Sequence, residues 1–149
     1  MSAELRIARP EDLAPVADLV RRYHASESHY PKLARVESVL EPLLDESELG
    51  RIWLVELGGR AIGYIALCFG YSIELGGRDA FIDEFYIVEE HRGKGIGAVV
   101  LEQIRPLARE LGIKALHLEV AHGNDRASKL YRRAGFTSRD RYHLMTLVP

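Results

Sequence analysis

The chain has 149 residues, 47% of them apolar and 28% charged, which suits one globular domain with a hydrophobic core. Its net charge of −2 argues against binding to nucleic acid or to an anionic membrane through overall charge. A single cysteine, Cys68, excludes a disulfide framework within the chain and favours a reducing compartment. With no signal peptide and no apolar run of membrane-spanning length, we expect one domain over residues 1–149, located in the cytoplasm.

The first third of the chain predicts one strand and two helices. Glu4 to Arg9 is typical of a short edge strand, and Pro10 to Asp12 places a proline and two acids in the first turn of a helix. The apolar stripe of that helix is Leu13, Val16, Ala17 and Val20. Tyr23 to Tyr30 breaks the pattern and predicts a loop. Pro31 then precedes a second amphipathic helix, whose stripe is Leu33, Val36, Leu40, Leu43 and Leu44.

The middle of the chain has the alternating pattern of strands. Ile52 to Leu57 and Arg60 to Tyr71 flank the pair Gly58-Gly59, which predicts a β-hairpin. A second pair, Gly76-Gly77, links this hairpin to a strand over Ala80 to Val88 that is rich in β-branched and aromatic residues.

A glycine-rich turn follows that strand and opens a helix. The turn is Arg92-Gly93-Lys94-Gly95-Ile96-Gly97, and the helix has an apolar stripe of Ile96, Val100, Ile104, Leu107 and Leu111. Glycines let backbone N–H groups converge, and a helix N-terminus favours an anion, so the turn predicts a phosphate site. A cationic surface turn is the alternative, since neither a Walker A motif nor a full Gly-x-Gly-x-x-Gly is present. We expect Pro106 to kink this helix or to split it near Gln103.

The last part of the chain predicts a strand, a helix and a strand. Lys114 to Val120 is the first of these, and a helix follows over Asn124 to Arg133 with Asn124 or Asp125 as its N-cap. Phe136 to Leu147 is expected to form a closing strand. Mixed strand pairing under helices corresponds to an α+β fold.

Two motifs resemble those of one enzyme superfamily. Arg92, Gly95 and Gly97 form the pattern Arg-x-x-Gly-x-Gly between a hydrophobic strand and a helix. The second motif consists of Leu116 to Val120, Asn124, Ala127, Tyr131 and Gly135-Phe136. Their order and spacing resemble the GNAT superfamily of N-acetyltransferases. The resemblance implies a mostly antiparallel, twisted sheet of about six to seven strands with about four helices, in the order β-α-α-β-β-β-α-β-α-β.

The same resemblance implies direct transfer of an acetyl group from acetyl-CoA to an amine, without a metal. The glycine turn would bind the diphosphate. The strand before it would separate from the fifth strand at a bulge, pair with the pantetheine arm and hold the developing oxyanion with a backbone N–H. The residues implied in cofactor binding are Phe85, Tyr86, Ile87, Arg92, Gly93, Lys94, Gly95, Ile96, Gly97, Ala98, Asn124 and Tyr131. The six histidines show no metal-ligand spacing.

Transfer to an amine requires a group that accepts a proton, because an amine with a pKa of ~10 is mostly protonated at neutral pH. Three carboxylates qualify: Asp83, Glu84 and Glu119. Asp83 and Glu84 are adjacent on one strand, so alternation predicts that they face opposite sides. By resemblance, Asp83 holds the position of an acid that contacts the amine in diamine acetyltransferases. Glu119 holds that of the base in ribosomal-protein N-terminal alanine acetyltransferases. We favour Glu119 or Glu84 acting through a water; each acid is otherwise an ordinary strand carboxylate.

The departing thiolate requires a proton, and Tyr131 matches the tyrosine of the superfamily that supplies it. Without the flanking motif, packing against Ala127, Leu130 and Ala134 would explain the tyrosine equally well. Asn124 fits both a helix cap and a contact to the cofactor arm.

The acceptor of such a fold usually lies against the loop between the first two helices and a late hairpin, here Tyr23 to Tyr30 and about Thr137 to His143. Glu27 and Asp83 would then hold a cationic amine such as a polyamine or an aminoglycoside, while a peptide amine stays open as an acceptor. A homodimer is implied by the resemblance alone. The alternatives to an enzyme are a non-catalytic module that binds acyl-CoA and a binder of another phosphate ligand, such as a nucleotide.

Overall fold

The computed structural model describes residues 2–27 and 35–149, and the chain divides into two compact units, Met1–Glu119 and Val120–Pro149. The described residues form a mixed α+β fold with four α-helices, as predicted, and a sheet of five strands. The prediction of six to seven strands is therefore wrong.

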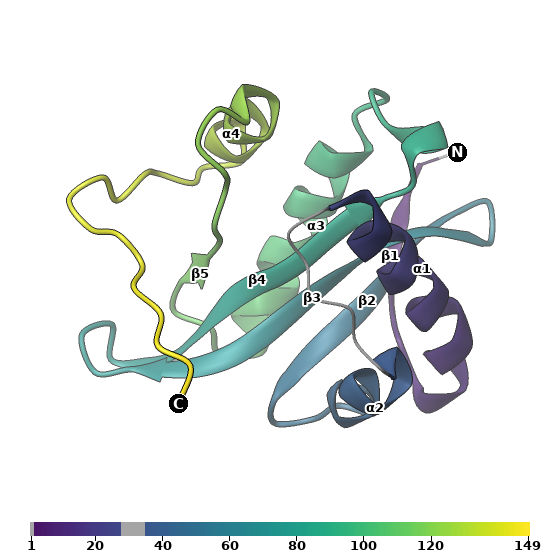
Figure 1. Ribbon diagram of the computed structural model, residues 1–149, viewed down its shortest axis with the longest axis horizontal. Helices are drawn as coiled ribbons and strands as arrows, with labels where there is room; N and C mark the ends of the chain where they lie inside the picture. The colour runs from purple at the N-terminus through teal and green to yellow at the C-terminus, as the bar shows by residue number, and fades with distance from the viewer. Residues whose placement is uncertain (1, 28–34) are drawn as a thin grey trace. The chain divides into compact units, whose positions relative to one another are not determined.

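The sheet lies in the first unit, and its strands neighbour one another in chain order (Figure 1). These strands are β1 (Glu4–Ile7), β2 (Gly50–Leu57), β3 (Arg60–Ser72), β4 (Gly77–Ile87) and β5 (Leu116–His117). The first four are antiparallel, and β5 runs parallel to β4. The hairpin prediction is confirmed: Gly58 and Gly59, both with positive φ, join β2 to β3.

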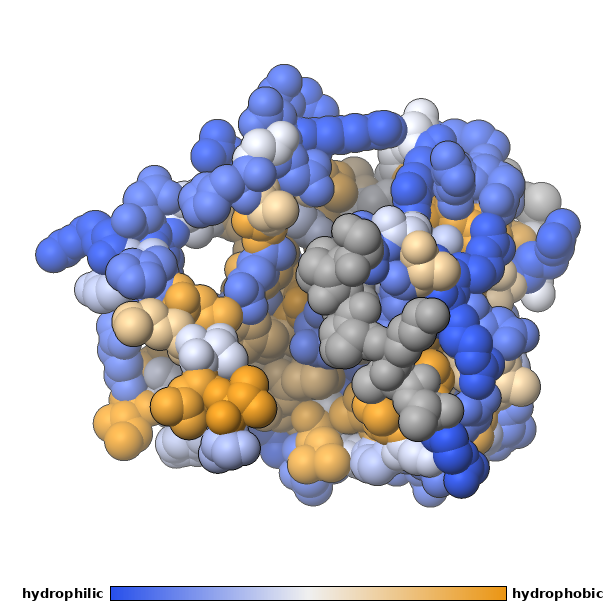
Figure 2. All heavy atoms as spheres, in the orientation of Figure 1, coloured by the Kyte–Doolittle hydropathy of each residue, from blue (hydrophilic) through white to orange (hydrophobic). Residues whose placement is uncertain are grey.

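Helices cover both faces of this sheet. α1 (Leu13–Ser26) and α2 (Val36–Leu40) lie on one face and α3 (Ile96–Glu110) on the other (Figure 1). The buried stripes are Val16, Ala17, Leu19 and Val20 in α1 and Ile96, Val100, Leu101, Ile104 and Ala108 in α3. Figure 2 shows hydrophilic side chains along the outer side of α1, as expected for an amphipathic helix.

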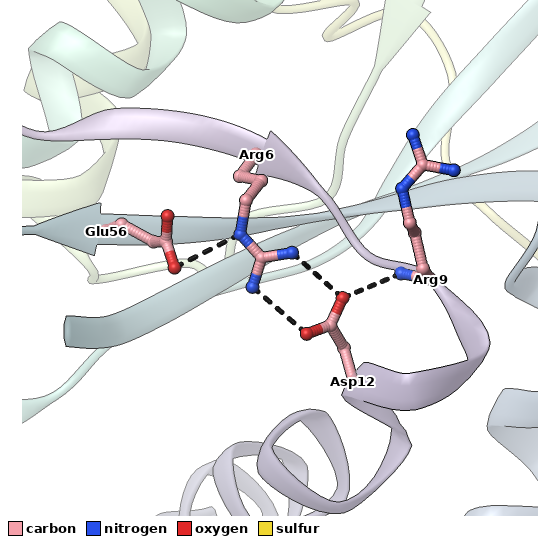
Figure 3. A network of polar contacts seen from close by, with 4 residues as sticks. All are labelled: Arg6, Arg9, Asp12 and Glu56. Atoms are coloured by element: carbon pink, nitrogen blue, oxygen red, sulfur yellow. Dashed lines mark hydrogen bonds and ion pairs between the residues drawn. The ribbon is translucent and has the colours of Figure 1, made fainter. Parts of the chain in front are cut away.

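A network of charged groups fixes the path of the chain from β1 into α1 (Figure 3). Arg6 donates two hydrogen bonds of 3.0 Å to the carboxylate of Asp12 and pairs with Glu56 at 3.2 Å. The backbone N–H of Arg9 donates to the same Asp12 carboxylate at 2.8 Å. A 3-10 turn over Pro10–Asp12 therefore precedes α1, where the sequence predicted that the helix itself begins.

Three helix predictions need correction. α1 continues to Ser26 instead of ending before Tyr23, because Tyr23 stacks on Tyr86 of β4 with ring centroids 5.3 Å apart. The predicted second helix is short: α2 is followed by a 3-10 turn over Glu41–Leu43, and Pro31 and Leu33 lie outside the described residues. α3 runs through Pro106 without a break, so the predicted split is wrong. A proline in a helix interior is unfavourable by ~3 kcal/mol relative to alanine, and the burial of side chains on both sides of Pro106 offsets this free energy.

Two strand predictions near the C-terminus also differ from the structure. β5 is limited to Leu116–His117, although Lys114 still donates a backbone hydrogen bond of 2.8 Å to Arg78. Residues 136–147 form no strand, and those after Phe136 are exposed without exception. The β-forming residues in that segment lack a partner strand, and side-chain preference does not replace the hydrogen bonds that a partner provides.

Candidate active site

β4 carries a β-bulge at Asp83. Glu84 pairs with Ala66 of β3 and Ile82 pairs with Leu67, which leaves Asp83 without a partner across the ladder. A bulge interrupts the alternation of side chains. The prediction that Asp83 and Glu84 face opposite sides relied on that alternation and stays a prediction; of the two side chains, Asp83 is exposed and Glu84 is half-buried.

Beyond Phe81, one edge of β4 pairs with no strand of the described residues, and we call it the free edge. Its pairing with β5 involves only Ala80 and Phe81, although β4 continues to Ile87. The N–H of Val88 donates to Ile62 on β3, so alternation directs the backbone groups of Phe85 and Ile87 toward the open edge. The backbone groups of Phe85 and the N–H of Ile87 therefore have no strand partner among the described residues, and their pairing with an extended ligand stays a prediction.

The glycine turn joins this edge to the N-terminus of α3. Gly93 and Gly95 have φ angles of 74° and 78°, and a Cβ atom at Gly95 would meet nothing within 4 Å. No side chain of the described residues caps α3. The first three N–H groups of the helix, on Ile96, Gly97 and Ala98, therefore have no helical acceptor. These converging donors fit an anionic group such as a diphosphate.

The two cations of the turn are placed differently. Arg92 lies over the ring of Tyr86, 5.3 Å from its centroid, and its Nε donates to the carbonyl of Ile87 at 2.8 Å. It therefore ties the turn to the end of β4, while Lys94 is exposed.

Glu84 is enclosed by two partners from other elements. The hydroxyl of Tyr64 on β3 donates to its Oε1 at 2.7 Å, and Nε2 of His24 on α1 lies 2.6 Å from its Oε2. The side chains of His24 and Glu84 are only 17% and 14% exposed. Sequence reasoning missed both partners, since neither spacing nor residue type indicates contacts between residues that are 60 and 20 positions apart.

Asp83 differs from its neighbour. Its carboxylate makes no hydrogen bond or ion pair to any residue that the structure describes, and its outer side is exposed. Desolvation by the surrounding groups raises the pKa of Asp83, the charges of Glu84 and Glu119 raise it further, and His24 opposes them. Glu84 and Glu119 thus act on Asp83 electrostatically.

Cys68 lies near the same carboxylates but is not poised as a nucleophile. Burial and the charges of Asp83 and Glu84 raise the pKa of its thiol to about 11. The thiolate, which is the reactive form, is therefore scarce at neutral pH.

Another pair links β4 to β5. Nε2 of His117 lies 3.1 Å from Asp79, and the His117 ring packs against Phe81 at 5.2 Å. His117 therefore supports the short β4–β5 contact from which the free edge begins.

The second unit contains the remaining predicted site residues. Asn124 accepts a hydrogen bond of 3.2 Å from the N–H of Ala127, which confirms it as the N-cap of α4 (Asp125–Arg133). Tyr131 packs edge-on against Phe136 at 5.8 Å, and burial raises the pKa of its phenol. Its catalytic role stays a prediction.

Glu27 is the C-cap of α1, where its N–H donates to the carbonyl of His24 at 3.2 Å. The rest of the predicted acceptor loop, from Ser28 to Tyr30, lies outside the described residues. Within the described part of the chain, no group of three or more His, Cys, Asp or Glu side chains is arranged to hold a metal ion. No helix in that part is long and apolar enough to cross a membrane.

Comparison with known proteins gives consistent results. The model of the acetyltransferase (GNAT) family matches residues 14–136. The N-acetyltransferase YhfO of Bacillus subtilis, itself uncharacterised, is 28% identical over 132 residues, covering 89% of this chain and 88% of its own. Thialysine N-epsilon-acetyltransferase of Mus musculus is 25% identical over 144 residues, covering 90% and 84%. The crystal structure of an integron cassette protein from the metagenome of the Cole Harbour salt marsh is similar, with a TM-score of 0.83, 32% identity and coverage of 97% and 91%.

Proposed function

Because this chain belongs to the acetyltransferase (GNAT) family and is an acetyl-CoA-dependent N-acetyltransferase, we propose that it acetylates a cationic primary amine. The observation that carries the proposal is the set of three carboxylate side chains around the β4 bulge. Asp83 has no hydrogen-bond or ion-pair partner among the described residues, and it adds its charge to those of Glu84 and Glu119. Such a group attracts a cation, and the similarity to a thialysine N-acetyltransferase supports a side-chain-like amine as acceptor.

The first unit supplies the surface on which the thioester would be held. Residues 93–98 provide backbone donors for its diphosphate, and Phe85 and Ile87 provide backbone groups for its extended arm. We further propose that Tyr86, Arg92 and Asn124 each contact the cofactor. Acetyl-CoA supplies the activated acetyl group. Because the family match includes parts of both units, we propose that they serve one domain.

Different side chains of the protein carry out the two proton transfers of the reaction. In our proposal Asp83, with Glu27, anchors the ammonium form of the acceptor, and Glu84 or Glu119 accepts its proton through a water. Tyr131 holds a proton for the leaving thiolate. Burial, which raises the pKa of Tyr131, keeps that proton on the phenol at neutral pH. Transfer from a phenol to a thiolate costs about 2 kcal/mol at reference pKa values, a gap that nearby backbone dipoles and the acceptor's own proton reduce.

The acceptor class is tested by following thiol release from acetyl-CoA with a panel of amines. The panel contains a polyamine, thialysine, an aminoglycoside, a peptide with a free N-terminus and a neutral amide as the blank. We expect the highest kcat/KM with acceptors that carry more than one cationic amine. A preference for the peptide would contradict the cationic-amine proposal. Binding of acetyl-CoA without turnover on any amine would favour a non-catalytic module.

Tyr131→Phe is the matched variant in this assay, since it removes only the hydroxyl. General acid catalysis is worth about 10²-fold or more, so we expect kcat to fall by about that factor under chemistry-limited conditions while acetyl-CoA still binds. A variant with wild-type kcat would remove Tyr131 from the mechanism without affecting the acceptor proposal.

A further inference from the structure

The carboxylate of Glu84 is held on both of its oxygens by side chains from two different elements. Tyr64 on β3 donates to Oε1 at 2.7 Å, and His24 on α1 lies 2.6 Å from Oε2. Hydrogen bonds to a charged carboxylate are short and roughly twice as strong as neutral ones. With both oxygens engaged and little solvent access, this carboxylate has one orientation.

The contact between His24 and Glu84 connects the end of α1 to the β4 bulge. His24 lies two residues before the end of α1, and its carbonyl accepts the N–H of Glu27. Glu84 directly follows Asp83, the residue without a partner across the ladder. The His24–Glu84 contact therefore spans the distance between the two acids that we propose to hold the amine.

We propose that His24 is a positioning residue for acetyl transfer, which acts by donating from Nε2 to Glu84 and so, together with Tyr64, fixes the charge of Glu84 beside the acceptor amine. The inference rests on the proposed function, because it assumes an amine at the bulge. It assigns a role to a residue on α1, outside both motifs that carry the family resemblance.

Two substitutions of His24 test whether its hydrogen-bond donor is what matters, apart from its ring and its charge. Glutamine places an amide N–H near the position of histidine Nε2, whereas alanine leaves no donor. We expect His24→Ala to lower kcat/KM for the amine by about tenfold to a hundredfold, since hydrogen bonds to charged groups are worth roughly 1.5–3 kcal/mol. His24→Gln should stay within about threefold of wild type, because it restores the donor. The KM for acetyl-CoA should change in neither variant.

Two further variants separate positioning from general damage. Tyr64→Phe removes the other donor and keeps the ring in the core, so it should lower kcat/KM in the same direction as His24→Ala. When Glu84 is already replaced by Gln, adding His24→Ala should lower kcat/KM for the amine by less than about twofold. The effects of two residues that act through one another are not additive. His122→Gln, at an exposed histidine of the second unit, is the control and should match wild type.

The outcomes are distinct. The positioning role would be overturned if His24→Ala kept the wild-type kcat/KM for the amine. It would also be overturned if His24→Gln lost as much kcat/KM as His24→Ala. A third contradicting result would be that His24→Ala lowers kcat/KM by the same factor in Glu84→Gln as in wild type. If wild type itself turns over no amine, the proposed function fails, and that result is visible before any variant is made. If His24→Ala proves unstable, Tyr64→Phe and His24→Gln still decide between the outcomes.

Discussion

At the scale of single residues, Asp83 and Glu84 are adjacent in the chain but have opposite environments. Glu84 is half-buried and bonded on both oxygens, whereas Asp83 is exposed and has no partner among the described residues. The carboxylate of Glu84 is held in place by its two partners, and that of Asp83 is open to a ligand. The bulge in the β4 ladder contributes to this division, because it leaves Asp83 without a cross-strand partner while Glu84 keeps its pairing with Ala66 on β3.

Asp12 allows a test of the network at the start of α1. Its carboxylate receives the Arg6 guanidinium and the Arg9 N–H, and the Arg6 hydrogen bonds are the main cause that lowers the pKa of Asp12. We expect Asp12→Asn to reduce the free energy of unfolding at neutral pH by about 1.5–3 kcal/mol, the worth of hydrogen bonds to a charged group. Denaturant unfolding followed by circular dichroism measures this difference.

The same pair predicts how the difference depends on pH. Because the folded-state pKa of Asp12 lies below that of the unfolded chain, its contribution is complete above ~3.9, the reference value, and is lost as the pH falls through the folded pKa. Wild type and Asp12→Asn should therefore converge in stability in acid. A difference that stays constant from neutral to acidic pH would show that the charge on Asp12 is not what stabilises the junction.

The local roles of residues could be predicted from sequence, and the long-range ones could not. The helix cap at Asn124 is predictable because it depends on a residue three positions away, and the turn at Gly95 is predictable from the glycines around it. The partners of Glu84 come from α1 and β3, and their positions depend on packing of the whole sheet. The sequence around His24 lacks an apolar pattern and therefore predicts a loop, whereas His24 lies in α1.

At the scale of elements, β3 and β4 determine the position of the site, because the bulge, the free edge and the glycine turn all belong to β4 or follow it. The hairpins were predictable from their glycine pairs, and α1 and α3 from their apolar stripes, although the end of α1 was not. The closing strand over residues 136–147 was not, because strand formation depends on a partner that the sequence does not specify.

Gly63 tests how closely β3 and β4 must approach. A Cβ atom there would lie 2.2 Å from the carbonyl oxygen of Tyr86, a backbone atom that cannot rotate away. We expect Gly63→Ala to lower the free energy of unfolding by about 1–3 kcal/mol or more, as overpacking does, and to weaken acetyl-CoA binding because the strand leading to the glycine turn must shift. Denaturant unfolding and calorimetric titration with acetyl-CoA measure the two effects.

Gly59→Ala is the control for this change. Gly59 has a φ angle of 78° and open space around it, so its substitution costs about 1 kcal/mol from backbone conformation and disturbs no neighbour. If Gly63→Ala were no more destabilised than Gly59→Ala and bound acetyl-CoA normally, the close β3–β4 contact would not be required for the site.

At the scale of the whole molecule, acetyl-CoA binding and folding are linked. A ligand that binds only the folded protein adds about 2.7 kcal/mol of stability at one hundred times its Kd. For a chain of this length, that gain raises Tm by about 5–10 °C. Because the donors of the glycine turn and the free edge of β4 suit an acyl thioester of a diphosphate, we expect acetyl-CoA to raise Tm and equal concentrations of ATP or NAD to do so far less.

Gly95→Asp should abolish this shift without unfolding the protein. Aspartate is a preferred N-cap residue and tolerates a positive φ better than most side chains, so α3 should survive. Its carboxylate would occupy the N–H groups that we propose for the diphosphate and would repel it. Gly112→Asp is the matched control, because Gly112 has a φ angle of 75° and open space at the other end of α3. We expect Gly112→Asp to retain the full acetyl-CoA shift; an equal shift in Gly95→Asp would mean that the diphosphate binds elsewhere.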